Sequence, residues 1–227
     1  MKNNNTIIVE FNGLAGLGKT TVANILKGEL SKEGYCVIGW YRHSILHSLR
    51  PMFAVPYSFC LYRKVKKYAD SIQPYQKDRK YVHWTNHFVR MYKNIEKHSD
   101  ADFAIIDEAI VQFLVAMGLN DRFPQSPLLD AVVEKIKSMG VSFVRVDCVN
   151  NIEAAYERIK SRPPKGMYYE DWSKDELTAQ LEAETYNFEY LRTVFSRVYP
   201  EQLVISIDTQ DSPAENARKI KEIITKI

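Results

Sequence analysis

Long apolar runs, paired cysteines and repeats are all missing from this sequence of 227 residues. No apolar run approaches the roughly 18 residues that a membrane-spanning helix needs, so we expect no membrane association. The opening residues MKNNNTIIVEF lack the apolar stretch of a secretion signal. The three cysteines, Cys36, Cys60 and Cys148, are odd in number and far apart. They argue against a disulfide framework and favour a reducing, cytoplasmic location.

The composition is that of an ordinary globular protein. Hydrophobic residues make up 45% of the chain and charged residues 26%. Nine glycines and nine prolines are too few for a collagen-like or linker sequence. Because a chain of this length typically forms one domain, we expect residues 1–227 to do so.

Five short apolar segments alternate with segments of helical periodicity. The apolar segments are predicted strands at residues 6–11, 36–41, 103–106, 141–146 and 203–207. Helices are predicted at 19–30, at 151–162 and from Ser173 to about Val198, the last opened by a capping box. This alternation predicts a three-layer α/β/α fold around a five-stranded parallel sheet, with a helical insertion at residues 43–98.

Residues 13–20 match the pattern G-x-x-x-x-G-K-[ST] between a predicted strand and a predicted helix. Glycines let backbone N–H groups turn toward phosphate oxygens, and the helix N-terminus adds partial positive charge. Lys19 can reach the β- and γ-phosphates, the Thr20 hydroxyl can ligate Mg²⁺, and Thr21 is placed to donate toward the α-phosphate. The predicted nucleoside triphosphate site consists of Gly13, Leu14, Ala15, Gly16, Leu17, Gly18, Lys19, Thr20 and Thr21.

With this Walker A loop the sequence resembles the P-loop NTPase superfamily. Its order of elements is similar to that of the nucleoside and nucleotide kinases, thymidylate kinase among them. The resemblance is specific at residues 13–21, with weaker matches at 102–108, 158–162 and 203–208. It implies a kinase that transfers the γ-phosphoryl group of ATP, with Mg²⁺, to a nucleoside monophosphate or a nucleoside. Kinases of this kind often form dimers, so the resemblance allows a homodimer.

Two carboxylates, Asp107 and Glu108, follow the predicted strand at 103–106. Ligands bind at the carboxyl ends of parallel strands, and a carboxylate there can hold Mg²⁺ or accept a proton from an attacking hydroxyl. We predict that Asp107 holds the metal together with Thr20 and positions the acceptor, and that Glu108 is a candidate base or a partner that supports this site without touching the metal. Thymidylate kinases carry Asp-Arg at this place, whereas this sequence has Asp-Glu.

Arg158 and Arg162 are four residues apart in a predicted helix, which would place both on one helix face. Negative charge that develops on a transferred phosphoryl group must be met by positioned cations. The pair is similar to the R-x-x-x-R lid of small-molecule P-loop kinases. On that resemblance, residues 158–172 form a lid whose arginines contact the phosphates, and adenine lies near Asp208 and Thr209.

The net charge of +3 is unevenly distributed along the chain. Residues 41–100 carry a net charge of +8, together with all five histidines and half of the 14 tyrosines. A basic and aromatic segment favours an anionic acceptor that bears a ring, although a solvated basic helix face is the alternative. We predict that Trp40 or Tyr41 stacks on the base of a small-molecule acceptor and that Arg42 binds its phosphate. Arg90 is similar to the acceptor arginine of nucleoside monophosphate kinases, and on that resemblance it also binds the acceptor.

Two other functions stay open at this point. The Asp-Glu pair also resembles the metal-binding and catalytic acids of ATPases, which would make the protein a switch that hydrolyses ATP. A basic, tyrosine-rich segment could instead serve an end-phosphorylating kinase of nucleic acids. The chain carries neither the N/T-K-x-D guanine signature, nor D-x-x-G after the strand, nor an LSGGQ-like motif. We favour the kinase with a small acceptor.

Overall fold

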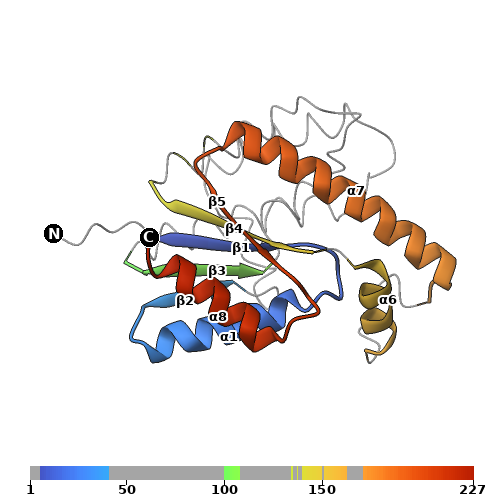
Figure 1. Ribbon diagram of the computed structural model, residues 1–227, viewed down its shortest axis with the longest axis horizontal. Coiled ribbons are helices and arrows are strands. Elements are labelled where there is room, and N and C mark those ends of the chain that lie inside the picture. Colours follow the sequence, from blue (N-terminus) through green and yellow to red (C-terminus); the bar gives the residue numbers. More distant parts are fainter. Residues whose placement is uncertain are drawn as a thin grey trace, which may run out of the picture.

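The computed structural model describes residues 6–40, 100–107, 134, 137, 140–149, 151–162 and 171–227. In this part of the chain five strands form one parallel sheet (Figure 1). The strands are β1 (Ile7–Asn12), β2 (Val37–Trp40), β3 (Phe103–Asp107), β4 (Ser142–Cys148) and β5 (Leu203–Ile207). Their order is β2-β3-β1-β4-β5, so β1 is the central strand and all carboxyl ends share one edge.

The sequence of each strand reflects its place in the sheet. All residues of β1 after Ile7 are buried, as are Phe103–Ile106 of β3, because both faces of a parallel sheet are covered. The edge strand β5 instead alternates exposed and buried residues from Val204 to Ile207. The chain passes from β1 to one side of the sheet and from β3 to the other, so the order reverses beside β1. Ligands bind at such a reversal, outside the carboxyl ends of the strands.

Four helices with described bounds cover the sheet. α1 (Lys19–Lys32) and α8 (Pro213–Ile224) pack against each other on one face, and α7 (Lys174–Val198) lies on the opposite face (Figure 1). α6 (Ile152–Lys160) lies near the carboxyl ends of the strands and contacts α7. The layers are therefore helix, sheet and helix.

Aromatic side chains fasten α7 to the sheet. The ring of Phe143 on β4 lies 5.7 Å from that of Phe195 on α7 and 6.0 Å from that of Tyr199, measured between centroids. Phe195 is completely buried. Burying one such side chain stabilises a fold by roughly 1.5–3 kcal/mol, so this cluster holds α7 in place.

The predicted fold class is confirmed, with the five strands at the expected places. One helix boundary is wrong: the helix predicted to reach Arg162 ends at Lys160, with Ser161 as its C-cap. A proline at 163 explains the early end, because it disfavours helical backbone in the residue before it. The expected helical insertion at residues 43–98 lies outside the described residues.

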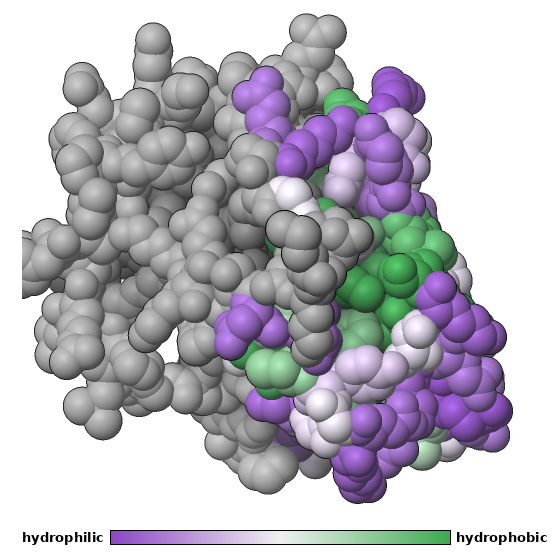
Figure 2. All heavy atoms as spheres, turned by 90° about the vertical axis from the view of Figure 1, so that its left-hand side faces the viewer, coloured by the Kyte–Doolittle hydropathy of each residue, from purple (hydrophilic) through white to green (hydrophobic). Residues whose placement is uncertain are grey.

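Exposed large hydrophobic residues are few among the described residues. Figure 2 shows one face, on which hydrophobic side chains gather in one area with hydrophilic side chains around them. The exposed large hydrophobic residues in the described ranges are Val149, Tyr186, Val204 and Ile227. None of the helices described here combines the length and the apolar character that crossing a membrane requires.

Candidate active site

The phosphate loop, residues 13–20, connects β1 to α1. Gly16 and Gly18 adopt φ angles of 87° and 82°, a left-handed conformation that favours glycine. Space also limits the residue at Gly16, because a Cβ atom there would lie 2.7 Å from the carbonyl oxygen of Ala155 on α6. This glycine therefore allows α6 to pack directly against the loop.

The start of α1 provides an anion-binding end. Gly18 is its N-cap, without a side-chain cap and without an acidic residue in the first turn. The N–H groups of Thr21 and Val22 donate to the Gly18 carbonyl oxygen at 2.9 and 3.1 Å. The N–H groups that precede these first internal hydrogen bonds have no partner within a helix, and the helix dipole adds partial positive charge. Phosphate oxygens fit such an end.

Lys19 is held inside the loop. Its side-chain ammonium donates to the carbonyl oxygens of Gly13 at 2.7 Å and Leu14 at 2.8 Å, and the residue is 5% exposed. Charges in such surroundings are screened less than in water. The buried ammonium can therefore attract a phosphate oxygen strongly.

Thr20 and Asp107 meet at the carboxyl ends of β1 and β3. The Thr20 hydroxyl donates a hydrogen bond to Oδ2 of Asp107, although the two residues are 87 positions apart. Both offer the hard oxygen ligands that Mg²⁺ prefers, and nucleotide sites typically hold Mg²⁺ with one or two such groups plus phosphates and water. No group of three or more His, Cys, Asp or Glu that could hold a metal occurs in the described ranges. The pair thus fits a Mg²⁺ that the nucleotide helps to bind.

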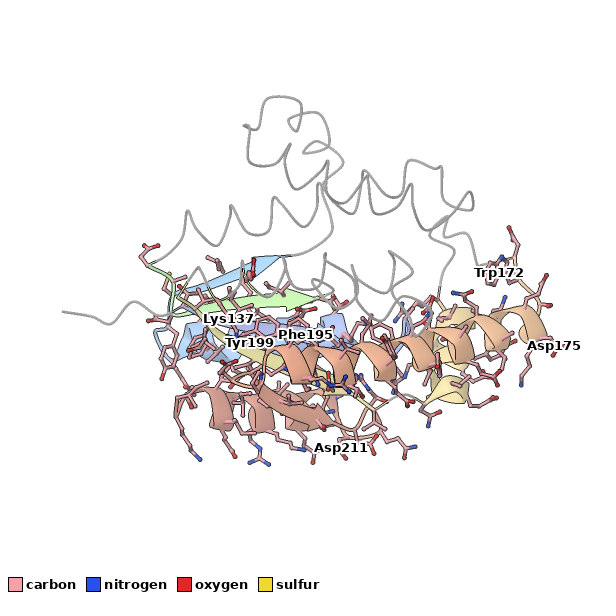
Figure 3. The ribbon with its side chains drawn as sticks, turned by 90° about the horizontal axis from the view of Figure 1, so that it is seen from above. Lys137, Trp172, Asp175, Phe195, Tyr199 and Asp211 are labelled. Carbon is pink, nitrogen blue, oxygen red and sulfur yellow. The ribbon has the colours of Figure 1, made fainter. Side chains whose placement is uncertain are left out.

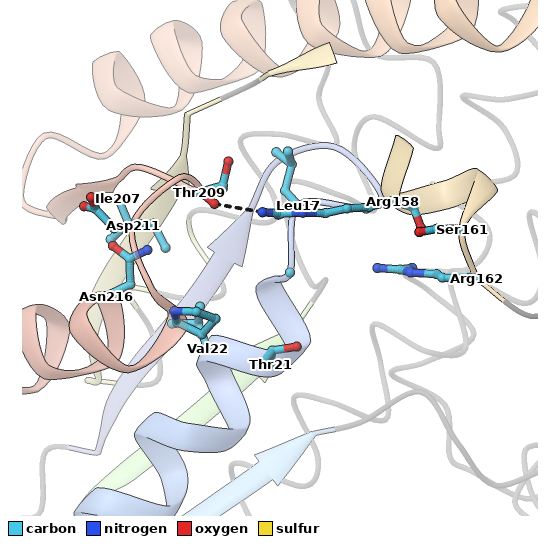
Figure 4. Close-up of a pocket in the computed structure, with 13 residues that line it drawn as sticks. Leu17, Thr21, Val22, Arg158, Ser161, Arg162, Ile207, Thr209, Asp211 and Asn216 are labelled. Atoms are coloured by element: carbon cyan, nitrogen blue, oxygen red, sulfur yellow. Dashed lines mark hydrogen bonds between the residues drawn. The ribbon is translucent and has the colours of Figure 1, made fainter. Parts of the chain in front are cut away.

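A cavity of about 390 Å³ adjoins the phosphate loop (Figure 4). This volume lies within the range of small-molecule sites. Its walls come from the loop and α1, from the end of α6, and from the segment between β5 and α8. The lining residues are Gly16, Leu17, Gly18, Thr21, Val22, Arg158, Ser161, Arg162, Ile207, Thr209, Asp211, Pro213 and Asn216.

Arg158 and Arg162 both line this cavity but are placed differently. Nη2 of Arg158 donates to the carbonyl oxygen of Thr209 at 3.0 Å, which connects α6 to the segment after β5 (Figure 4). Arg162 is exposed and lies beyond the end of α6. The expectation that both arginines share a helix face is therefore wrong, and the tertiary structure brings them to one cavity instead.

Asn216 is a cavity residue that the sequence analysis does not identify. It is buried, and its Nδ2 donates to the carbonyl oxygen of Asp208 at 2.7 Å, which holds the turn between β5 and α8. Buried Thr209 lines the cavity beside it, so the segment expected to hold adenine does border the cavity. The only local sign of this role in the sequence is that Asn216 is a polar residue in the first turn of α8.

Cys148, the last residue of β4, lies under the phosphate loop. Burial raises the pKa of its thiol to about 11, although Lys19 and Arg192 act in the opposite direction. The thiol is therefore protonated at neutral pH and is a poor nucleophile. Its contribution is to packing, since a Cβ atom at Gly13 would lie 3.0 Å from the Cβ of Cys148.

The remaining predicted site residues fall into two groups. Leu14, Ala15 and Leu17 pack in or against the hydrophobic core, so their side chains shape the loop. Four others lie outside the described residues, namely Tyr41, Arg42, Arg90 and Glu108.

Comparison with solved structures finds the deoxyadenosine kinase of M. mycoides. Its structure with the products dCMP and a flexible dCDP gives a TM-score of 0.51 at 16% identity, over 97% of this chain and 100% of that chain. The same kinase with bound dCTP gives 0.48 at 14% identity, over 97% and 100%. A crystal structure of APE1195 gives 0.49 at 18% identity, over 99% and 97%. No protein-family model and no curated protein sequence matches the chain. The first similarity shows that the chain shares the overall α/β fold of that structure.

Proposed function

We propose that this chain, with its nucleoside-kinase-like P-loop fold, is a phosphotransferase that uses ATP and Mg²⁺. The observation that carries the proposal is that the phosphate loop and two arginines of the lid segment border one cavity. A cation supplied by the same chain is what phosphoryl transfer requires and what the neutral variable positions of the loop lack. This arrangement favours transfer chemistry over a site that only binds a nucleotide.

Each residue then has a definite part in the reaction. The first N–H groups of α1 and the Lys19 ammonium bind phosphate oxygens, and Thr20 and Asp107 hold Mg²⁺, which supplies positive charge to the phosphates. Arg158, tied to Thr209, would contact the nucleoside end of the bound nucleotide, because adenine is expected beside Thr209. Exposed Arg162 has no such tie among the described residues and can reach the charge that develops on the γ-phosphoryl group.

The acceptor we propose is a nucleoside monophosphate or a nucleoside. The basic segment 41–100, with Tyr41, Arg42 and Arg90, supports a ring-bearing and anionic acceptor. The similarity to a deoxyadenosine kinase, whose structure contains dCMP and dCDP, agrees with an acceptor of the nucleoside class.

The test is ADP formation from ATP and Mg²⁺ with a panel of nucleosides, nucleoside monophosphates, sugars and a 5′-hydroxyl oligonucleotide. Lys19→Ala provides the blank. We expect one class of nucleoside acceptor to raise ADP output well above the rate without acceptor. Asp107→Asn should lower that rate and raise the Mg²⁺ concentration needed for half-maximal activity, since the carboxylate charge is lost.

Two results would contradict the proposal. Equal ADP formation with and without every acceptor would identify water as the acceptor and Glu108 as the candidate base of an ATPase. Stimulation by the oligonucleotide alone, with affinity falling steeply as salt rises, would identify a nucleic-acid kinase.

A further inference from the structure

A cluster of charged side chains is buried between the sheet and α7, and the proposed reaction does not use it. Arg145 and Asp147 on β4 are only 3% and 8% exposed. Nε of Arg145 donates to Oδ2 of Asp147 at 3.1 Å, and Nη2 lies 3.0 Å from the same oxygen. Nε of Arg192, on α7, lies 3.3 Å from the other carboxylate oxygen. Asp147 therefore pairs with two arginines.

Arg192 also reaches the main chain beneath the phosphate loop. Its Nη2 donates to the carbonyl oxygen of Cys148 at 3.0 Å and to that of Asn12 at 3.4 Å. Asn12 is the last residue of β1, Cys148 the last of β4, and the two strands are neighbours in the sheet. One guanidinium nitrogen thus ties together two strand ends.

Those strand ends form the base of the phosphate loop. The carbonyl group of Asn12 and the N–H group of Gly13 belong to one planar peptide unit, so holding the carbonyl orients that N–H. Gly13 also rests on Cys148, whose Cβ and carbonyl oxygen would lie 3.0 and 3.4 Å from a Cβ atom at position 13. The Lys19 ammonium donates hydrogen bonds to the next two carbonyl groups along the chain, those of Gly13 and Leu14. Cations therefore hold three successive carbonyl groups at the start of the loop.

The helix that carries Arg192 also contacts α6. Lys160, at the end of α6, donates to the carbonyl oxygen of Trp172 at 2.7 Å, just before α7 begins. α7 then runs from the end marked by Asp175 to the end marked by Tyr199 (Figure 3). α7 thus contacts both α6, which bears Arg158, and the base of the phosphate loop.

Fold stability alone does not account for Arg192. Arg145 already pairs with Asp147 and binds α7, through the carbonyl oxygen of Arg192 at 3.2 Å and the hydroxyl of Ser196 at 3.2 Å. A second arginine, whose side chain is only 16% exposed, adds a desolvation cost that ion pairing often fails to recover. What Arg192 adds beyond Arg145 is the pair of bonds to the strand ends under the loop.

We propose that Arg192 is a positioning residue of the phosphate loop, which fixes the carboxyl ends of β1 and β4 so that the loop is formed before nucleotide binds. The inference rests on the proposed function, because it assumes that the loop binds a triphosphate. Arg192 acts through the main chain and touches no substrate.

The test compares three variants for binding of Mg²⁺ and the non-hydrolysable analogue AMP-PNP by calorimetry, with thermal unfolding measured in parallel. Arg192→Met is expected to bind the analogue about tenfold more weakly than wild type, the effect of losing charged hydrogen bonds that hold the loop. Arg192→Lys should recover about half of this loss on a logarithmic scale, since an ammonium can reach one carbonyl but not both strand ends.

Arg145→Met is the matched control. It removes the other arginine that pairs with Asp147 and binds α7. The hydrogen bonds from Arg192 to Asn12 and Cys148 are left in place. We expect it to lower the melting temperature at least as much as Arg192→Met while keeping the dissociation constant within about twofold of wild type.

Two results would overturn the inference. Equal loss of affinity in Arg192→Met and Arg145→Met, or unchanged affinity in both, would show that the cluster serves only the stability of the fold, and the proposed function would stand. Absence of AMP-PNP binding in the wild-type protein would overturn the proposed function and this inference together.

Discussion

α1 and α8 pack side by side on one face of the sheet, yet their N-termini are built differently. The N-cap of α8 is Ser212, whose hydroxyl accepts from the Glu215 N–H at 3.2 Å while the Glu215 carboxylate accepts from the Ser212 N–H at 3.1 Å. The N-cap of α1 is Gly18, and this helix has neither a capping side chain nor an acidic residue in its first turn. The first turn of α8 is satisfied within the protein, whereas α1 leaves its partial positive charge for an outside anion.

The other two helices with described N-termini resemble α8. α7 has the same reciprocal cap between Ser173 and Glu176, and α6 is capped by Asn151, which accepts from the Ala154 N–H at 2.9 Å. An uncapped end forgoes roughly 1 kcal/mol of stabilisation. Among these four helices the chain forgoes it only at α1, where the phosphate loop precedes the helix.

The largest expected effect comes from removing the cation beside this uncapped end. Lys19→Met should lower kcat by at least about 10²-fold, because a buried positive charge that faces the phosphates is lost. Steady-state ADP formation with the best acceptor measures the change. Lys32→Met is the control on the same helix, since Lys32 is exposed and forms a surface ion pair with Glu29. Retention of more than half of the activity in Lys19→Met would exclude the proposed role of the loop.

A second substitution makes the start of α1 resemble the capped ends. Gly18→Asp would place a carboxylate where phosphate is expected, while Gly18→Asn bears the same left-handed backbone without the charge. We expect AMP-PNP to bind about tenfold more weakly to the Asp variant than to the Asn variant, from helix-end and phosphate electrostatics. Equal dissociation constants in calorimetry would place the anion site elsewhere.

Removing the N-cap of α7 should lower the stability of the fold without changing nucleotide affinity. Ser173→Ala is expected to lower the free energy of unfolding by about 1 kcal/mol and the melting temperature by roughly 2–4 °C. Nucleotide affinity should stay within about twofold of wild type. Ser173→Asn, which can cap the helix again, should restore most of the melting temperature. A loss of nucleotide affinity in Ser173→Ala as large as that in Gly18→Asp would contradict the distinction between the N-termini of α7 and α1.

The smallest expected effect is a pH dependence at the same cap. Hydrogen bonds from the Ser173 backbone N–H and hydroxyl hold the pKa of Glu176 below its ordinary value of 4.5. A lowered folded-state pKa adds stability above the unfolded pKa, and this stability is lost as pH falls through the folded pKa. Urea unfolding at about pH 6 and about pH 3.5 should therefore show a slightly smaller acid-induced loss of stability in Glu176→Gln than in wild type. An identical or larger loss would contradict the lowered pKa.

Local patterns were sufficient for much of the fold. Apolar runs bounded by turns predicted all five strands, and the spacing of Ser173 and Glu176 predicted the cap of α7 that the structure contains. The motif at 13–20 predicted the turn from β1 into α1. These features depend on residues within a few positions of one another, so the sequence carries them directly.

The meeting of Thr20 and Asp107 was expected from the phosphate loop and the strand that ends at Asp107, but other contacts between distant segments were not accessible in the same way. Arg162 was expected on the face of α6 and lies past its end, because helix ends depend on how the chain leaves the helix. Asn216 gave no sign of lining a cavity. The alternation of Arg145 and Asp147 in an apolar strand is the only trace of the buried cluster, and nothing in α7 marked Arg192 as its partner.

The sequence by itself determined the order of strands and helices, the phosphate loop and the identity of its lysine and threonine, because short-range periodicity and backbone geometry encode them. The tertiary structure decided which of these elements meet. It brought Thr20 to Asp107 across 87 positions, Arg158 to Thr209 across 51, and Arg192 to Asn12 across 180. These pairs depend on the strand order β2-β3-β1-β4-β5, and that order follows from how the whole chain packs rather than from any local pattern.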